Sequence, residues 1–172
     1  MRLFLSQKLI ASTVVFVSTL VASCKPASST NSSTETLTVY EAAPTLTPLD
    51  LGPPGNSPGD AYYFSAQLYS SPGGRMIGEV FGSKTLMKIA GQANPDSEKR
   101  ETLLFFTFNR GQDQIIALGA TDYPPTAAEF GAGQPVSRAI LGGTGKYMGV
   151  RGQLTSTRNA DGTYKQEFTL LK

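Results

Sequence analysis

The chain has 172 residues, with 15 lysines and arginines against 13 aspartates and glutamates, no histidine and one cysteine. The lack of histidine excludes Ser-His-Asp triads, Cys-His pairs and imidazole metal sites, and a single cysteine excludes thiolate metal clusters. There is no dinucleotide fingerprint between a strand and a helix. We therefore expect neither a metal nor a cofactor.

Residues 1–23 have the pattern of a secretory signal peptide. Arg2 and Lys8 precede an uncharged apolar stretch of about fourteen residues, which is shorter than the roughly twenty that a membrane-spanning helix needs. Removing this segment takes away two basic residues and no acidic ones, so the rest of the chain balances 13 positive charges against 13 negative ones. A neutral domain has no electrostatic reason to bind nucleic acid.

Cys24 ends a Val-Ala-Ser-Cys sequence that fits a bacterial lipobox. We predict that Cys24 carries a lipid and anchors the protein at the cell envelope, at the outer membrane because Lys25 is not the aspartate that retains many lipoproteins in the inner membrane. The alternative is ordinary signal cleavage, which would leave a secreted or periplasmic protein with a free thiol. Residues 24–36 are rich in serine and threonine and predict a flexible linker before a domain at residues 37–172.

Short alternating runs separated by turn residues dominate this domain, and no long helical period occurs. Asp161-Gly162 supplies the positive φ that a tight hairpin turn requires. Eight strands at this spacing favour a barrel or a sandwich, and closure into a barrel removes exposed edges. The predicted strands are residues 37–42, 61–69, 76–89, 101–109, 114–120, 136–141, 147–156 and 163–171.

The predicted strand at residues 101–109 is apolar on both faces. Leu104, Phe106 and Phe108 share one face, and Leu103 and Phe105 share the other. A strand buried on both sides must be covered from outside as well as from inside. The cover is either the loop at residues 123–134 folded over the strand or an interface with another copy of the chain.

Residues 136–157 join two strands through a glycine-dense turn that reads GGTGKYMGVRG. This segment resembles the GG-S/T-G-x-F-x-x-A/G-x-G signature shared by plant allene oxide cyclases and dirigent proteins. The resemblance extends to Leu37-Thr38-Val39-Tyr40-Glu41, to Gly59-Asp60 with Phe64 and Leu68-Tyr69-Ser70, and to Phe105-Phe106-Thr107-Phe108. It implies a closed eight-stranded antiparallel β-barrel with an apolar cavity, and a dimer or trimer.

Glu41 is the predicted catalytic residue. Leu37, Val39 and Glu41 share one strand face, so the carboxylate ends an otherwise apolar row. If that face lines the cavity, burial raises the pKa of Glu41, which suits a general acid, a general base or a group that stabilises positive charge. The resemblance places Glu41 where the cyclases have the glutamate assigned to cation stabilisation. The alternative is that the strand ends before Glu41 and the carboxylate faces water.

Strand alternation also predicts the apolar side chains that contact a ligand: Val39, Tyr62, Phe64, Leu68, Phe106, Phe108 and Phe168. Glu79 is a second acidic candidate, because Ile77 and Phe81 flank it on its own face. Its alternative role is a surface ion pair with Lys84 or Arg75.

Two functions are consistent with these features. The first is an exported, lipid-anchored barrel that binds a hydrophobic small molecule in its cavity. The second is a cofactor-independent cyclase or isomerase, or a dirigent-like enzyme, that steers an apolar substrate with help from Glu41. The sequence departs from the plant cyclases at Ala43 and Ala66, where the resemblance would place asparagines. We therefore do not expect allene oxide cyclisation, and binding is the preferred hypothesis.

Overall fold

The structure is a computed structural model that describes residues 33–91 and 96–171. The predicted signal peptide, Cys24 and the linker up to residue 32 lie outside the described residues. Within the described part, no helix has the length and apolar character needed to cross a membrane. The described elements are β1 (Thr34–Glu41), β2 (Thr45–Leu49), β3 (Ala61–Tyr69), β4 (Met76–Lys88), β5 (Glu98–Phe108), β6 (Asp113–Tyr123), β7 (Pro135–Thr144), β8 (Arg151–Arg158) and β9 (Tyr164–Leu171), with single-turn 3-10 helices η1 (Asn109–Gly111) and η2 (Gly145–Tyr147).

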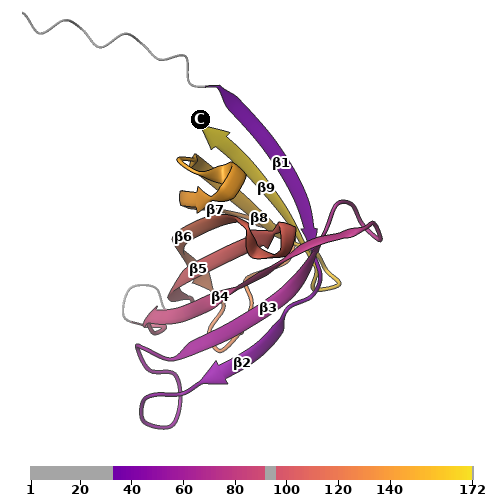
Figure 1. Cartoon of the computed structure of the whole chain (residues 1–172). Helices are drawn as coiled ribbons and strands as arrows, with labels where there is room; N and C mark the ends of the chain where they lie inside the picture. Colours follow the sequence, from indigo (N-terminus) through magenta and orange to yellow (C-terminus); the bar gives the residue numbers. More distant parts are fainter. Residues whose placement is uncertain (1–32, 92–95, 172) are drawn as a thin grey trace, which may run out of the picture. The chain divides into compact units, whose positions relative to one another are not determined.

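All strand pairs are antiparallel, and the sheet closes on itself (Figure 1). The strands follow one another as β1-β9-β8-β7-β6-β5-β4-β3, and β1 then pairs back onto β3 through Tyr40–Tyr69 and Glu41–Leu68. β2 pairs with the same edge of β3 further along, so β1 and β2 together fill one position in the ring. The prediction of a closed eight-stranded antiparallel barrel is confirmed.

The predicted strand at residues 61–69 has the observed bounds, and most of the other bounds differ by one to four residues. The largest difference is at β8, which begins at Arg151 and not at residue 147, because Gly145–Tyr147 form η2. β1 begins at Thr34, because the exposed residues Thr34 to Thr36 still pair with Leu171 to Thr169 of β9 through the backbone. β2 was not predicted, because its sequence TLTPL contains a proline. That proline, Pro48, is tolerated because β2 pairs with β3 on one side only.

The glycine-dense signature forms the sharp turn between β7 and β8. Gly145 opens η2 with a φ of +59°, and a Cβ there would lie 2.2 Å from the Asp113 carboxylate. Gly152 has a φ of +141°, and a Cβ there would lie 1.9 Å from the carbonyl oxygen of Thr169 on β9. A side chain at residue 145 would push the start of β6 away, and one at residue 152 would push β9 away, so the signature allows this turn to pack tightly against both strands.

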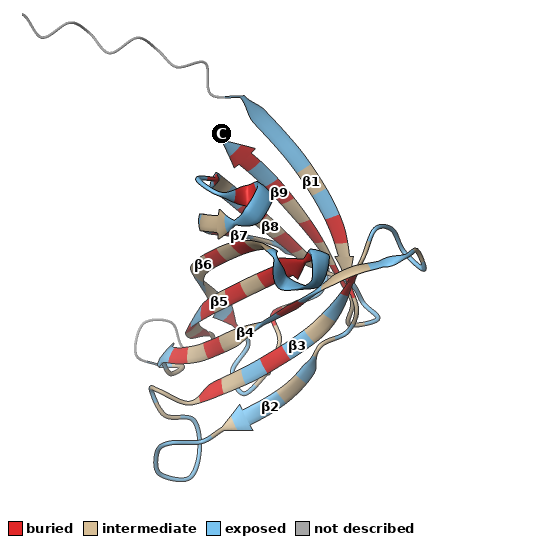
Figure 2. Ribbon diagram, in the orientation of Figure 1, coloured by how far each residue is buried: buried red, intermediate tan, exposed pale blue. Residues whose placement is uncertain are grey.

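The barrel interior has an apolar half and a polar half. Buried residues recur along β5 (Figure 2). Its inward side chains change from Glu98, Arg100 and Thr102 to Leu104, Phe106 and Phe108. The apolar half is a continuous core in which the Phe106 and Phe168 rings meet edge to face, with centroids 4.9 Å apart. The buried charged side chains gather in the polar half, and we call the barrel end at that half the mouth.

Candidate functional site

Glu41 lies inside the barrel, in the polar half. It is the last residue of β1, where it pairs with Tyr164 of β9, and its face also carries Leu37 and Val39. The side chain is only 4% exposed, and its Oε2 accepts a hydrogen bond of 2.5 Å from Nε2 of Gln166. The inward orientation of Glu41 therefore matches the sequence prediction.

Burial raises the pKa of Glu41 from 4.5 to about 7. The hydrogen bond from Gln166 and the charges of Lys84 and Arg138 oppose this rise, whereas the charge of Glu129 adds to it. Near neutral pH the carboxyl group is thus present in both protonation states. A group with this pKa can give or take a proton at physiological pH.

A chain of hydrogen bonds along the neighbouring strands β1, β9, β8 and β7 connects Glu41 to Arg138. Nη1 of Arg138 donates to Oγ of Ser156 at 3.0 Å, and Ser156 donates to Oε1 of Gln166 at 2.6 Å. The amide of Gln166 then donates to Glu41. All four side chains are buried, so the network holds the carboxyl group in one place.

Lys84 is the second buried cation of the polar half. It lies on β4, and its Nζ forms an ion pair of 2.6 Å with Oε2 of Glu129. Burial lowers the pKa of Lys84, and the attraction of Glu129 offsets this only in part. Sequence analysis had suggested Lys84 as a surface partner of Glu79, and this is wrong. The two residues are five positions apart, so strand alternation puts them on opposite faces.

The mouth is covered by the connection between β6 and β7, residues 124–134, which we call the roof loop. Its Thr126 N–H donates to Oε1 of Glu98 at 3.3 Å, and its Ala128 carbonyl lies 3.5 Å from Nζ of Lys84. Glu129 accepts a short hydrogen bond from the Tyr164 hydroxyl. The loop therefore lies over the mouth, and these contacts are not with the outer face of β5.

Phe130 fills the space under the roof loop. Its ring meets Tyr123 and Tyr164 edge to face, at centroid distances of 5.9 and 5.6 Å. The cavity that remains beneath it has a volume of about 20 Å³, enough for about one water molecule. It is lined by Glu41, Pro44, Phe64, Lys84, Thr102, Leu104, Tyr123, Phe130, Arg138, Ser156, Tyr164 and Gln166.

The predicted ligand contacts are placed differently from Glu41. Phe64 lines the cavity, and Tyr62 lies nearer the rim of the mouth, beside Arg100. The other five side chains pack into the apolar core, where each is at most 6% exposed: Val39, Leu68, Phe106, Phe108 and Phe168. Alternation gives the face of a residue but not its depth along the barrel, and these five belong to the packed half.

A second cavity of about 210 Å³ lies at the rim, between Arg100 and the loop that follows β2. The Arg100 guanidinium lies between the rings of Tyr62 and Tyr123 and forms an ion pair of 2.7 Å with Oε2 of Glu98. Oε1 of Glu98 also accepts hydrogen bonds from the Asn56 side chain and from the roof loop at Thr126. Glu98 thereby joins the two loops at the mouth.

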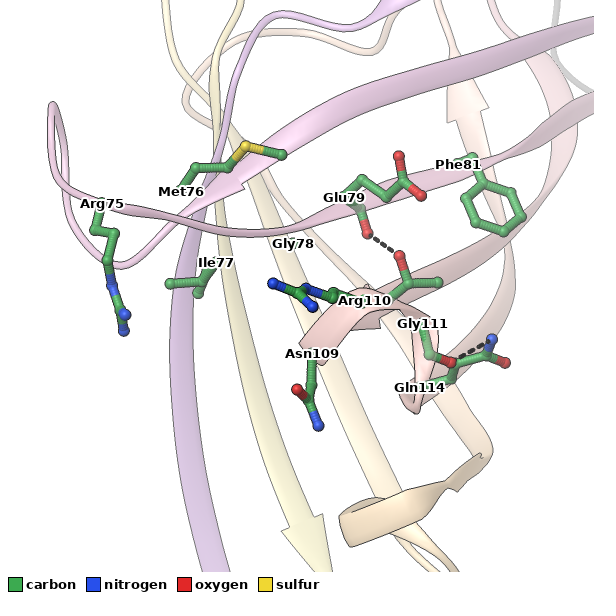
Figure 3. A pocket seen from close by; sticks show the side chains of 11 residues that line it. Arg75, Met76, Ile77, Gly78, Glu79, Phe81, Asn109, Arg110, Gly111 and Gln114 are labelled. Carbon is green, nitrogen blue, oxygen red and sulfur yellow. Dashed lines mark hydrogen bonds between the residues drawn. The ribbon is translucent and has the colours of Figure 1, made fainter.

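Glu79 lies far from these contacts, on the outer wall. It borders an open groove of about 950 Å³ between the start of β4 and η1, together with Arg75 and Arg110 (Figure 3). On the same wall Phe81 stacks on Phe105 at 5.4 Å and is 39% exposed. The outer face of β5 is thus partly open. Glu79 is exposed, but neither of the ion pairs expected for it, with Lys84 or with Arg75, occurs among the described residues.

Among residues 33–91 and 96–171, no group of three or more His, Cys, Asp or Glu side chains is placed to hold a metal ion.

The site also contains residues that sequence analysis did not select. Lys84 and Gln166 could have been found by extending alternation from their strand neighbours. Arg138 could have been found in the same way, because it shares the inward face of β7 with Ile140. Glu129 and Phe130 carry no comparable signal, because their positions depend on how the roof loop folds.

Comparison with solved structures places this barrel among known proteins. A structure named pyocyanin demethylase matches with a TM-score of 0.58 and 30% identity, over 80% of this chain and 99% of its own. A pterocarpan synthase dirigent protein matches with a TM-score of 0.57 and 14% identity, over 86% and 96%. This chain belongs to the family of allene oxide cyclase-like and dirigent-like barrels.

A Diels–Alderase from Streptomyces koyangensis matches this chain with a TM-score of 0.58 and 16% identity. The match covers 84% of this chain and 70% of the Diels–Alderase chain. At that identity the likeness extends to the barrel fold alone. A scan against protein-family models and a search of curated proteins found no match.

Proposed function

We propose that this barrel binds a small, largely apolar molecule at its mouth, and that Glu41 exchanges a proton or a hydrogen bond with it. The observation that carries this proposal is the position of Glu41. Its carboxyl group is buried at the end of an apolar row and held by Gln166, and its pKa is near neutrality. Such an arrangement fits recognition of a polar group on an otherwise apolar ligand.

The composition of the polar half supports a role beyond stability. Burying Glu41, Lys84 and Arg138 costs solvation free energy, and apolar side chains of similar size would often be at least as stable there. The apolar half of the same barrel contains apolar side chains of this kind at its inward positions. A ligand that uses the charged groups would explain why the mouth is different.

Binding beneath Phe130 requires the roof loop to move, because the cavity there has a volume of about 20 Å³ and admits no organic ligand. The loop contains a strained residue, since Thr126 is β-branched and has a φ of +63°. Such strain costs about 1–3 kcal/mol and is common at switch segments. Displacement of the loop would relieve it.

A second candidate function is an isomerase or cyclase that uses Glu41 as a general acid or base. A carboxyl pKa of about 7 favours it, because proton transfer is most efficient when the pKa of the catalyst lies near the working pH. Family neighbours are named as a Diels–Alderase, a dirigent protein and a pyocyanin demethylase. Binding and catalysis would use the same mouth.

Pyocyanin is the first probe, because the neighbour at 30% identity is named for it. Titration calorimetry with pyocyanin and a panel of neutral polycyclic molecules measures binding, and chromatography after incubation detects any product. We expect at least one probe to bind, and Glu41→Gln to change its affinity about fivefold or more. Glu79→Gln on the outer wall is the matched control and should change nothing. If no probe binds, or if both variants behave alike, the proposal is wrong.

We also propose that the protein is exported and carries a lipid on Cys24. The support comes from the signal-like residues 1–23 and the lipobox that ends at this cysteine. Mass spectrometry of the protein from membranes would detect the lipid, and Cys24→Ser should release the protein into the soluble fraction. Equal membrane retention of both forms would contradict this anchor.

We further propose that the outer wall pairs with a second copy of the chain. The support is the partly exposed Phe81–Phe105 stack, next to Tyr63, which is 53% exposed. Light scattering of the purified protein gives the oligomeric state, and Phe105→Glu should lower it. A monomeric wild-type protein would contradict this pairing.

A further inference from the structure

The roof loop inserts two side chains into the mouth, Glu129 and Phe130. They are neighbours in the chain, and together they present one carboxylate and one aromatic ring. Their contacts with the barrel indicate which chemical groups a ligand of the mouth would need.

The carboxylate of Glu129 meets two donors from different strands. Its Oε2 forms the ion pair with Nζ of Lys84 and accepts the hydrogen bond from the hydroxyl of Tyr164. Its Oε1 is buried and has no hydrogen-bond partner among the described residues. One oxygen is thus bound strongly and the other is left unsatisfied, so a better placed carboxylate would gain a hydrogen bond.

The ring of Phe130 is enclosed by aromatic and cationic groups. Tyr123 and Tyr164 lie against it on two sides, and the guanidinium carbon of Arg138 lies 5.8 Å from its centroid. The side chain is 5% exposed. Edge-to-face and cation–π contacts of this kind accept an aromatic ring on any molecule, and do not require phenylalanine.

The charges of the mouth favour an anion once Glu129 is withdrawn. The ionised groups that line the cavity are then Lys84 and Arg138, with Glu41 as the only acidic side chain. The two cations exceed the acid, so the field inside the mouth attracts negative charge. Glu129 supplies that charge while the loop is closed.

We propose that the ligand of the mouth is an aromatic carboxylate that takes the places of the Phe130 ring and the Glu129 carboxylate. This inference rests on the proposed function and adds the class of ligand to it. The roof loop acts as a tethered competitor, so the ligand binds in proportion to how readily the loop withdraws. Lys84 and Tyr164 hold the ligand carboxylate, and Tyr123 and Arg138 hold its ring.

The decisive comparison uses two probes of nearly the same shape, the anion 2-naphthoate and the neutral 2-naphthamide, titrated calorimetrically into the purified protein. We expect 2-naphthoate to bind about tenfold more tightly. Glu129→Ala should tighten 2-naphthoate binding by about tenfold and should tighten 2-naphthamide binding clearly less. Both probes gain from the loosened loop, but only the carboxylate uses the freed Lys84 and Tyr164. Glu101→Ala is the matched control: Glu101 is exposed on the outer face of β5 and should have no effect.

Lys84 provides the second arm. Lys84→Arg keeps a cation and should keep the preference for 2-naphthoate, whereas Lys84→Met should remove it. Should Lys84→Met fail to fold, Glu129→Ala and Lys84→Arg still test the inference. Equal affinity of both probes in the wild-type protein, or weaker 2-naphthoate binding by Glu129→Ala, overturns it.

The two proposals fail in different ways. If pyocyanin or a neutral polycyclic molecule binds and responds to Glu41→Gln, but naphthoate has no advantage over naphthamide, the aromatic carboxylate is wrong and the small-molecule function stands. If none of these probes binds, the proposed function itself is wrong.

Discussion

The two halves of the barrel interior are built from the same strands but bury different chemistry. On β5, Phe106 and Phe108 pack among apolar neighbours, whereas Glu98 and Arg100, on the same face, bury an ion pair. The apolar half stabilises the barrel through close packing, and the polar half places charges where they cost stability. The comparison teaches that the fold and the site are separable along each strand. Changes in one half should leave the other half largely intact.

Phe106→Ala should have the largest effect on stability. Its ring is fully buried and meets Phe168, so truncation should lower the free energy of unfolding by about 3–5 kcal/mol. Urea unfolding measures this loss. At low temperature, where the variant remains folded, ligand affinity at the mouth should be unchanged. A large loss of affinity in a folded variant would restore Phe106 as a ligand contact.

Glu41→Gln should change how stability depends on pH. Because folding raises the pKa of Glu41 from 4.5 to about 7, the native state binds this proton more tightly than the unfolded chain does. The stability gained in this way is fully present below about pH 4.5 and is lost as the pH rises through about 7. We expect the wild-type protein to lose up to about 3 kcal/mol more than Glu41→Gln between pH 4.5 and 8. Urea unfolding at a series of pH values measures this difference. If the free energy of unfolding changed with pH in the same way for both proteins, the carboxyl group would be well solvated.

Lys84→Met and Lys99→Met compare a buried ion pair with an exposed one. Lys84 and Glu129 side chains are 6% and 15% exposed, whereas Lys99 and Asp122 are 39% and 58% exposed. Loss of Lys84 should cost about 2–3 kcal/mol, since Glu129 can partly escape to water as the loop moves. Loss of Lys99 should cost less than about 0.5 kcal/mol. Similar losses of stability for the two variants in thermal denaturation would show that the Lys84–Glu129 pair is as accessible to solvent as the Lys99–Asp122 pair.

Thr126→Gly should have the smallest effect. Glycine adopts a φ of +63° without strain, which should offset its larger entropy in the unfolded chain, so we expect a change within about 1 kcal/mol in the stabilising direction. Thr155→Gly, within β8, is the control and should destabilise. A clear loss of stability in Thr126→Gly would mean that this loop residue is not strained.

Sequence reasoning was most successful where alternation alone decides the structure. The inward row that ends at Glu41 and the inward position of Phe168 follow directly from a period of two. The closed barrel follows from the number of strands and from the glycine signature. These features depend on local pattern and on the requirement to close a sheet.

The composition of the mouth could not be predicted in the same way. Glu129 reaches Lys84 only after eight strands have closed and the roof loop has folded over them. The depth of Phe106 in the barrel depends likewise on the register between strands. Such contacts join residues far apart in the sequence and carry no periodic signal.

Glu98 gives the mouth a property that neither of its loops has alone. One carboxylate receives Asn56 from the loop after β2 and Thr126 from the roof loop, with Arg100 on its other oxygen. Withdrawal of the roof loop removes one of the three partners and weakens the hold on the remaining loop. The rim should therefore loosen cooperatively, so that hydrogen exchange in both segments would accelerate together when either one is perturbed.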